Sequence, residues 1–225
     1  MLHATTFTDN SMDTTKRLIL IPVRSFDVGK SRLAGISEAN RRRLLTDLAQ
    51  GVISELATIS RRVVVTTSDE VEEWASALGC LTLTTSSPLN VALSEALEEY
   101  GSEGGYGVVM GDIALPSRSS LAAIVSKPTP IVTSDRLYIG TSILTIPTSE
   151  RIDFKFGNGS FKSHLTEVIK HFGIAYAGSP TKETVDIDSF EDLLTLQGDK
   201  TLSPTERLRI ETMIKLTSQG VRNDL

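Results

Sequence analysis

Two aspartates near the carboxyl end of this chain are the residues whose spacing points most directly to chemistry. Asp186 and Asp188 stand two positions apart, and side chains two apart on an extended backbone point the same way. Carboxylates this close repel unless a cation lies between them, and hard oxygen ligands suit Mg²⁺ better than zinc. A solvated acidic strand end before a helix, with Ser189 as N-cap and Glu191 and Asp192 in its first turn, is the alternative. The solvated strand end explains the residues of the helix start. For Asp186 and Asp188, metal ligation and plain solvation both stay open.

A third carboxylate is expected at the same place. Asp112 follows Gly111 and the apolar stretch from Tyr106 to Met110, which favours a strand. The end of that strand would deliver Asp112 to the sheet edge that carries Asp186 and Asp188. On its own, an aspartate at a strand end is more often a turn or capping residue.

A basic loop follows the first apolar stretch, from Leu18 to Ile21. It places Arg24, Lys30 and Arg32 around one glycine, an arrangement that suits a polyphosphate. Gly-Lys-Ser at 29–31 imitates the end of a P-loop, but that motif requires a glycine where this chain has Arg24, so a P-loop is excluded. A basic surface loop is the simpler alternative.

A second turn could bind an anion. Gly157, Gly159 and Ser160 come directly before a helix expected from about residue 161, and free N–H groups at a helix start bind anions. Ser160 could instead be a purely structural N-cap. His164, one helical turn later, is interpreted as a packing or capping residue rather than a catalyst.

The elements that must position these residues alternate between strands and helices. The alternation predicts an α/β fold with a mostly parallel mixed sheet and helices on both faces, in which ligands bind beyond the carboxyl ends of the strands. A helix opened by Ser37 and a capping box at 67–70 belong to this pattern. Strands are expected at 18–21, 63–66, 81–84, 106–110, 130–133, 142–147 and 174–177, and further helices at 90–100, 118–125, 161–171, 189–197 and 203–218.

The bulk properties narrow the class of protein. The 225 residues are 40% hydrophobic with a net charge of −5, which argues against a broad nucleic-acid footprint. The first apolar stretch is too short to span a membrane, and the lone Cys80 can form no intrachain disulfide, so we expect a cytoplasmic protein. Residues 1–16 are expected to be a flexible tail, and 17–225 a single domain whose terminal amphipathic helix packs on the core or on a second subunit.

Taken together, these segments resemble the 2-phospho-L-lactate and phosphoenolpyruvate guanylyltransferase family of coenzyme F-420 biosynthesis. The resemblance runs from about Leu18 to Leu196. It rests on the order and spacing of Gly-Lys-Ser-Arg-Leu at 29–33, Pro-Leu-Asn at 88–90, Gly-Asp at 111–112, Asp-Arg-Leu at 135–137 with Gly-Thr at 140–141, Phe-Gly-x-x-Ser at 156–160, and Asp-x-Asp at 186–188.

The resemblance implies a three-layer, Rossmann-like nucleotidyltransferase fold related to the molybdenum-cofactor and sugar-nucleotide transferases. It implies a reaction that joins GMP from GTP to a small phosphorylated acid and releases pyrophosphate, and it leans toward a homodimer. The implied roles are Mg²⁺ ligation by Asp112, Asp186 and Asp188, contact of Lys30 with the nucleotide phosphates, a place for Asn90 near the guanine and ribose, and acceptor binding by Thr141, Gly157 and Ser160. The catalytic residues would be Lys30 and the three aspartates. Beside these, we expect Arg24 and Arg32 to add positive charge at the GTP phosphates, and Arg136 to help bind the acceptor.

Two segments depart from the family pattern. The family usually has Leu-Pro after the aspartate that matches Asp112, where this chain has Ile-Ala-Leu-Pro at 113–116, and a glycine-rich turn is replaced by Tyr138 and Ile139. These altered segments keep open the alternative of a non-catalytic nucleotide-binding module. Another Mg²⁺-dependent nucleotidyltransferase or glycosyltransferase is a second alternative, because Asp-x-Asp motifs also hold metal in those enzymes. The acceptor stays open among 2-phospho-L-lactate, phosphoenolpyruvate and 3-phosphoglycerate.

Overall fold

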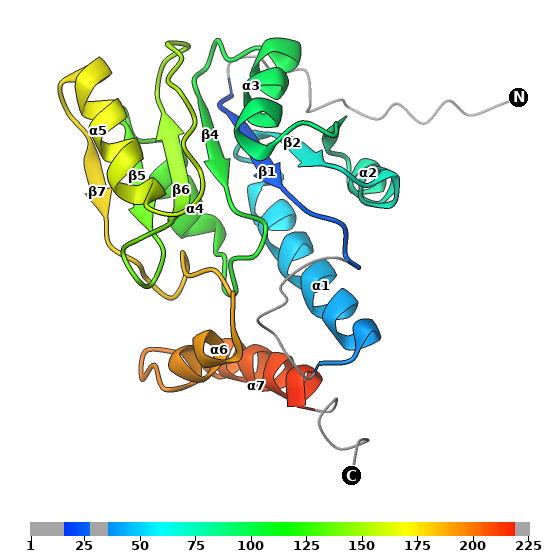
Figure 1. Ribbon diagram of the computed structural model, residues 1–225. Coiled ribbons are helices and arrows are strands. Elements are labelled where there is room, and N and C mark those ends of the chain that lie inside the picture. Colours follow the sequence, from blue (N-terminus) through cyan, green and yellow to red (C-terminus); the bar gives the residue numbers. More distant parts are fainter. Residues whose placement is uncertain (1–15, 28–35, 219–225) are drawn as a thin grey trace, which may run out of the picture.

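The computed structural model describes residues 16–27 and 36–218, whose strands form one seven-stranded sheet in the order β3-β2-β1-β4-β6-β5-β7 (Figure 1). The strands are β1 Leu18–Pro22, β2 Arg61–Thr66, β3 Leu81–Thr84, β4 Tyr106–Val109, β5 Ile131–Ser134, β6 Thr141–Ile146 and β7 Tyr176–Gly178. The helices are α1 Glu38–Leu56, α2 Asp69–Ala77, α3 Leu89–Tyr100, α4 Arg118–Val125, α5 Ser160–Phe172, α6 Phe190–Gln197 and α7 Pro204–Ser218.

The sheet is mixed because one strand runs against the others. β1 pairs in parallel with β2 and β4, β2 with β3, and β5 with β7, whereas β6 is antiparallel to both β4 and β5. The predicted α/β class with a mostly parallel mixed sheet is therefore confirmed. Since β6 is reversed, its first residue, Thr141, lies at the edge where the parallel strands end.

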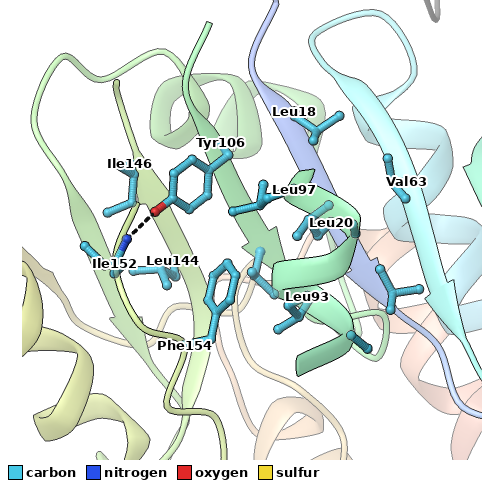
Figure 2. Packing of buried hydrophobic residues seen from close by; sticks show 14 of the residues in the cluster. Leu18, Leu20, Val63, Leu93, Leu97, Tyr106, Leu144, Ile146, Ile152 and Phe154 are labelled. Atoms are coloured by element: carbon cyan, nitrogen blue, oxygen red, sulfur yellow. Dashed lines mark hydrogen bonds between the residues drawn. The ribbon is translucent and has the colours of Figure 1, made fainter. Parts of the chain in front are cut away.

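Helices cover both faces of the sheet, which explains why β1 reads as an uninterrupted apolar run. Leu18 and Leu20 point into a core shared with α3 and α5, while Ile19 and Ile21 point into a second core with α1, α2 and α4. Figure 2 shows the first of these cores, where the hydroxyl of Tyr106 accepts the backbone N–H of Ile152 at 3.0 Å. Burying this phenol thus leaves its oxygen hydrogen-bonded.

A third core lies beyond the carboxyl ends of the parallel strands, where α6 and α7 pack beside α1 (Figure 1). The terminal helix thus packs on its own chain, one of the two predicted alternatives. Val185 and Ile187 are buried in this core while Asp186 and Asp188 are not. This alternation is the extended pattern predicted for the two aspartates, with alternate side chains anchored and solvated.

One local prediction, the capping box before α2, needs correction. Ser68 is the N-cap of α2, but its side chain makes no capping hydrogen bond, so the capping box expected at 67–70 does not form. The element boundaries otherwise fall within a few residues of those predicted. Within the described ranges, no helix combines the length and apolar character that crossing a membrane requires. The tail expected at 1–16 lies almost wholly outside the described residues.

Candidate active site

Three carboxylates converge at the edge of the sheet where the parallel strands end. Asp112, Asp186 and Asp188 each offer one oxygen, and these oxygens lie within 4.8 Å of one another. Asp112 comes from the turn after β4, and the other two come from the segment that leads into α6. The structure therefore brings together the trio that the sequence placed in separate segments.

Backbone pairing fixes the distance between these two segments. Ile113 and Asp186 form an antiparallel bridge. The N–H of Ile187 donates to the carbonyl of Asp112 at 3.0 Å, and the N–H of Ala114 donates to that of Val185 at 3.1 Å. The Ile-Ala-Leu departure at 113–115 is thus a buried, paired segment that supports the carboxylates.

Gly111 lets the turn that carries Asp112 approach the end of β1. A Cβ atom at this position would lie 2.9 Å from the carbonyl oxygen of Pro22, which is closer than real Cβ contacts. Only glycine fits without displacing the β1 backbone. The exposed Arg24 follows Pro22 by two residues, so the structure places it at the same edge. Lys30 and Arg32 lie outside the described residues.

Asp192, which the sequence assigned only to the helix start, organises the backbone around Asp188. Its Oδ2 accepts the N–H of Asp188 at 3.0 Å, the N–H of Ser189 at 2.7 Å and the hydroxyl of Ser189 at 2.9 Å. Its Oδ1 accepts Nε of Arg136 at 2.8 Å. Burial alone would raise the pKa of the Asp192 carboxyl, but the hydrogen bonds from Arg136 and residues 188–189 hold this pKa below its ordinary value.

Arg136 belongs to the polar loop between β5 and β6 and is predicted to help bind the acceptor. The carboxylate of Asp135 accepts the N–H groups of Ile139 at 2.9 Å and Gly140 at 2.7 Å, which closes the loop into a turn. Tyr138 occupies this turn at φ 58°, a left-handed conformation that favours glycine. The segment that replaces the family's glycine-rich turn therefore keeps a glycine-like backbone.

Thr141 is the first residue of β6, and its hydroxyl is hydrogen-bonded to a buried histidine. His164 Nε2 accepts the N–H of Lys155 at 2.9 Å, so the ring proton sits on Nδ1, which faces Thr141 Oγ1 at 2.9 Å. His164 is fully buried, and this burial together with Lys155 lowers its pKa from 6.5 to about 4, although Glu167 acts in the opposite direction. His164 is therefore neutral near pH 7, and the Thr141 hydroxyl keeps its own proton for a ligand.

The glycine turn before α5 is built differently from the predicted N-cap. The N-cap is Gly159, at φ 75°, and Ser160 is the first helical residue, almost fully buried. The N–H of Ser160 donates to Gly157 at 3.1 Å and that of Phe161 donates to Ile139 at 3.1 Å. The helix start is thus tied to the loop that carries Arg136.

Asn90 is expected at the nucleotide, and the structure shows it bound to the main chain. Its side-chain carbonyl accepts the N–H of Phe156 at 2.8 Å, and its amide nitrogen donates to the carbonyl of Phe156 at 3.1 Å. This pairing fixes the residue that precedes Gly157. Asn90 therefore positions the glycine turn, whatever further contact it makes with a nucleotide.

Sequence reasoning missed two supporting residues. Asp192 carried a usable signal, because an acid three residues after an N-cap serine is a capping box. Ser142 stands where the resembled family often has Asn, but that difference did not indicate its contacts: its Oγ lies 3.4 Å from Oδ1 of Asp186 and 3.2 Å from the carbonyl oxygen of Ser134.

Comparisons with known proteins identify relatives of this chain. The family described as Guanylyl transferase CofC like matches residues 17–222. The phosphoenolpyruvate guanylyltransferase of Thermobaculum terrenum is 26% identical over 79% of this chain and 81% of its own. The 2-phospho-L-lactate guanylyltransferase of Methanocaldococcus vulcanius is 28% identical over 82% of this chain and 86% of its own.

Solved structures share the fold at much lower identity. A chain described as a nucleotide-diphospho-sugar transferase from Desulfovibrio desulfuricans is similar with a TM-score of 0.68 and 12% identity, over 91% of this chain and 97% of that one. A nucleotidyl transferase from Methanothermobacter is similar with a TM-score of 0.55 and 16% identity, over 80% and 95%. These likenesses confirm the predicted nucleotidyltransferase fold.

Proposed function

The chain belongs to the CofC-like guanylyl transferase family, and from that premise we propose that it joins GMP from GTP to a small phosphorylated acid in coenzyme F-420 biosynthesis. The acceptors to consider are 2-phospho-L-lactate, phosphoenolpyruvate and 3-phosphoglycerate. The observation that carries the proposal is the convergence of the Asp112, Asp186 and Asp188 carboxylates within 4.8 Å at the ligand-binding edge of a nucleotidyltransferase fold.

The donor set of this site suits Mg²⁺. Three carboxylates supply hard oxygen ligands and negative charge, without the histidine or cysteine ligands that zinc prefers. Asp112, Asp186 and Asp188 would hold the ion, and the bound ion would neutralise phosphate oxygens and stabilise the departing pyrophosphate. The antiparallel bridge between Ile113 and Asp186 supports this assignment, because it fixes the carboxylates before any ligand arrives.

In the proposed reaction, a phosphate oxygen of the acceptor bonds to the α-phosphorus of GTP. The bond from that phosphorus to the oxygen that bridges it to the β-phosphorus breaks, and pyrophosphate leaves with the electron pair. The acceptor oxygen is already anionic near pH 7, so the protein needs no general base. This agrees with His164, whose two ring nitrogens are both engaged and which is neutral.

The residues of this chain then act by position and charge. Arg24, together with Lys30 and Arg32, which lie outside the described residues, would bind the β- and γ-phosphates, and Asn90 would lie beside the nucleotide. The hydroxyl of Thr141, which accepts from His164 and keeps its own proton, would donate to the acceptor. Gly157, Gly159 and Ser160 would present the start of α5 to the same anion, with Arg136 beside them.

The test is incubation of the purified protein with GTP, Mg²⁺ and each of the three acids separately, with mass analysis of the products. We expect one acid to yield its guanylylated form together with an equimolar amount of pyrophosphate. A sugar-nucleotide reaction would release a nucleoside diphosphate or monophosphate instead. GTP binding in a calorimeter without turnover on any acceptor would contradict the proposal and favour a non-catalytic module.

Three further expectations stay predictions beside this one. We expect residues 17–225 to form a single nucleotidyltransferase domain. We also expect a homodimer, and a cytoplasmic location without nucleic-acid or membrane partners.

A further inference from the structure

We propose that Asp192 and Arg136 form a positioning pair that holds Asp188 in its ligating place and joins it to the acceptor-binding loop. The proposal rests on the function proposed above. It concerns how this chain's own residues prepare the site: Asp192 is assigned no contact with the reacting atoms, and Arg136, proposed to lie beside the acceptor, also holds Asp192.

The contacts at Asp192 exceed what a helix start requires. A capping acid normally reaches the N–H of the N-cap residue, and Asp192 does this at Ser189. Its carboxylate also takes the N–H of Asp188 and the hydroxyl of Ser189, while its other oxygen takes Nε of Arg136. Four donors therefore converge on one carboxylate that is 6% exposed.

The neighbouring Glu191 separates the effect of negative charge at the helix start from the specific contacts of Asp192. Glu191 lies in the same first turn of α6 and is exposed to solvent. It can interact with the helix dipole, as acids in a first turn do. Glu191 is therefore a matched control for the specific contacts of Asp192.

Arg136 extends the arrangement to the acceptor side. It stands five residues before Thr141, in the turn that Asp135 closes through the N–H groups of Ile139 and Gly140. The same turn accepts the N–H of Phe161 at the start of α5. A single ion pair at 2.8 Å thus connects the backbone of Asp188 to the loop that leads into Thr141. Outer groups of this kind orient metal ligands in proteins.

The first test measures Mn²⁺ binding to the full chain by electron paramagnetic resonance, together with deuterium exchange in the peptide that spans residues 185–192. Replacing Asp192 with Ala should weaken Mn²⁺ binding by about 10-fold to 100-fold and accelerate exchange at the amides of Asp188 and Ser189. Asp192→Asn keeps one carbonyl acceptor and should lose less of the affinity. Glu191→Ala should match the unaltered protein in both measurements.

The second test separates the two members of the pair. Arg136→Gln should raise KM for the acceptor more than it weakens Mn²⁺ binding. The double variant with Asp192→Ala should bind Mn²⁺ no more weakly than Asp192→Ala alone, because Arg136 acts on the metal side through Asp192.

The outcomes distinguish this inference from the proposed function. If the unaltered protein binds no Mn²⁺, the metal assignment fails, while the exchange measurement still judges the pair. If Asp192→Ala and Asp192→Asn both keep full Mn²⁺ affinity and unchanged exchange, the positioning role is overturned. Should Asp192→Ala fail to fold, Asp192→Asn and Arg136→Gln supply the same two readouts.

Discussion

The two sides of the candidate active-site edge differ in charge and in burial. On one side, Asp112, Asp186 and Asp188 gather negative charge on side chains that keep access to solvent. On the other side, Thr141 and His164 are buried and uncharged near pH 7. The side chains on the charged side stay in contact with solvent, whereas the neutral side is joined by internal hydrogen bonds.

The difference has a physical reason. Burying a charge costs far more than burying a hydrogen-bonded neutral group. The three carboxylates therefore keep access to solvent, and the bridge between Ile113 and Asp186 fixes their backbone. A neutral donor such as the Thr141 hydroxyl can be buried and oriented in advance. Substitutions on the two sides should consequently fail in different ways.

The largest effect is expected on the charged side. Replacing Asp186 or Asp188 with Ala should lower guanylyl transfer by roughly 100-fold to 1000-fold, because a group that acts on transition-state charge is lost. The fold should persist, since Val185 and Ile187 still anchor the segment. Steady-state rates and far-ultraviolet circular dichroism measure the two effects. Near-normal rates in both variants would refute the metal assignment, and Glu191→Gln is the control for losing an acid nearby.

The neutral side should respond to pH through stability. The pKa of His164 is lowered from 6.5 to about 4 by burial and by Lys155, against the opposing effect of Glu167. Between pH 6.5 and pH 4, His164 therefore binds a proton in the unfolded chain but not in the folded protein. The contribution of His164 to the free energy of unfolding is fully present above pH 6.5. It is lost as the pH falls toward 4, by about 3 kcal/mol in total.

Urea denaturation between pH 4 and pH 7 measures this dependence. His164→Phe removes the titrating group, so its free energy of unfolding should fall less steeply with acid than that of the unaltered protein. Equal slopes in the two proteins would show that His164 is not a source of the pH dependence.

A smaller effect, on KM for the acid, is expected from replacing Thr141, because the change removes only one hydroxyl. Thr141→Val removes the donor and leaves Nδ1 of His164 without its partner at 2.9 Å. Losing a hydrogen bond to a charged acceptor costs about 1.5 to 3 kcal/mol, or roughly 10-fold to 100-fold in KM for the acid. Thr141→Ser keeps the hydroxyl and should retain most of the affinity. If the valine and serine variants bind the acid equally well, Thr141 makes no polar contact with it.

The smallest effect is expected at Gly159, where only the backbone matters. A Cβ at this position would meet no atom within 4 Å, yet its φ is 75°. Gly159→Ala should therefore destabilise the protein by about 1 to 2 kcal/mol through backbone strain alone. Asn tolerates this conformation better, so Gly159→Asn should lose less in a urea titration. An unchanged midpoint in Gly159→Ala would mean that the turn adopts another conformation.

The strand and helix pattern was predictable because it follows from local periodicity. The uninterrupted apolar run of β1, the glycines that end helices, and the alternation of Val185, Asp186 and Ile187 each report on nearby backbone alone. The convergence of the acids could be inferred as well, since strand ends meet at one edge. Sequence and fold therefore agree on which edge of the sheet gathers the three acids.

Contacts between distant segments could not be predicted in the same way. Asn90 is bound to the backbone of Phe156, and Arg136 to Asp192, across 66 and 56 residues. No local pattern encodes such pairs, because their partners depend on how the loops meet in space. The N-cap at Gly159 was missed for a related reason: serine is the preferred capping residue, but here Ser160 is drawn into the core.

The position of α6 and α7 along the chain has a consequence for biosynthesis. The core that anchors Ile187 unites the beginning of α1 with helices near residue 210, so the first and last thirds of the polypeptide must both have left the ribosome before it can close. Domains fold as units during synthesis, once their partners are available. A nascent chain halted before α7 would thus lack Ile210 and Met213 from this core, so we expect the segment that carries Asp186 and Asp188 to become ordered only after α7 emerges.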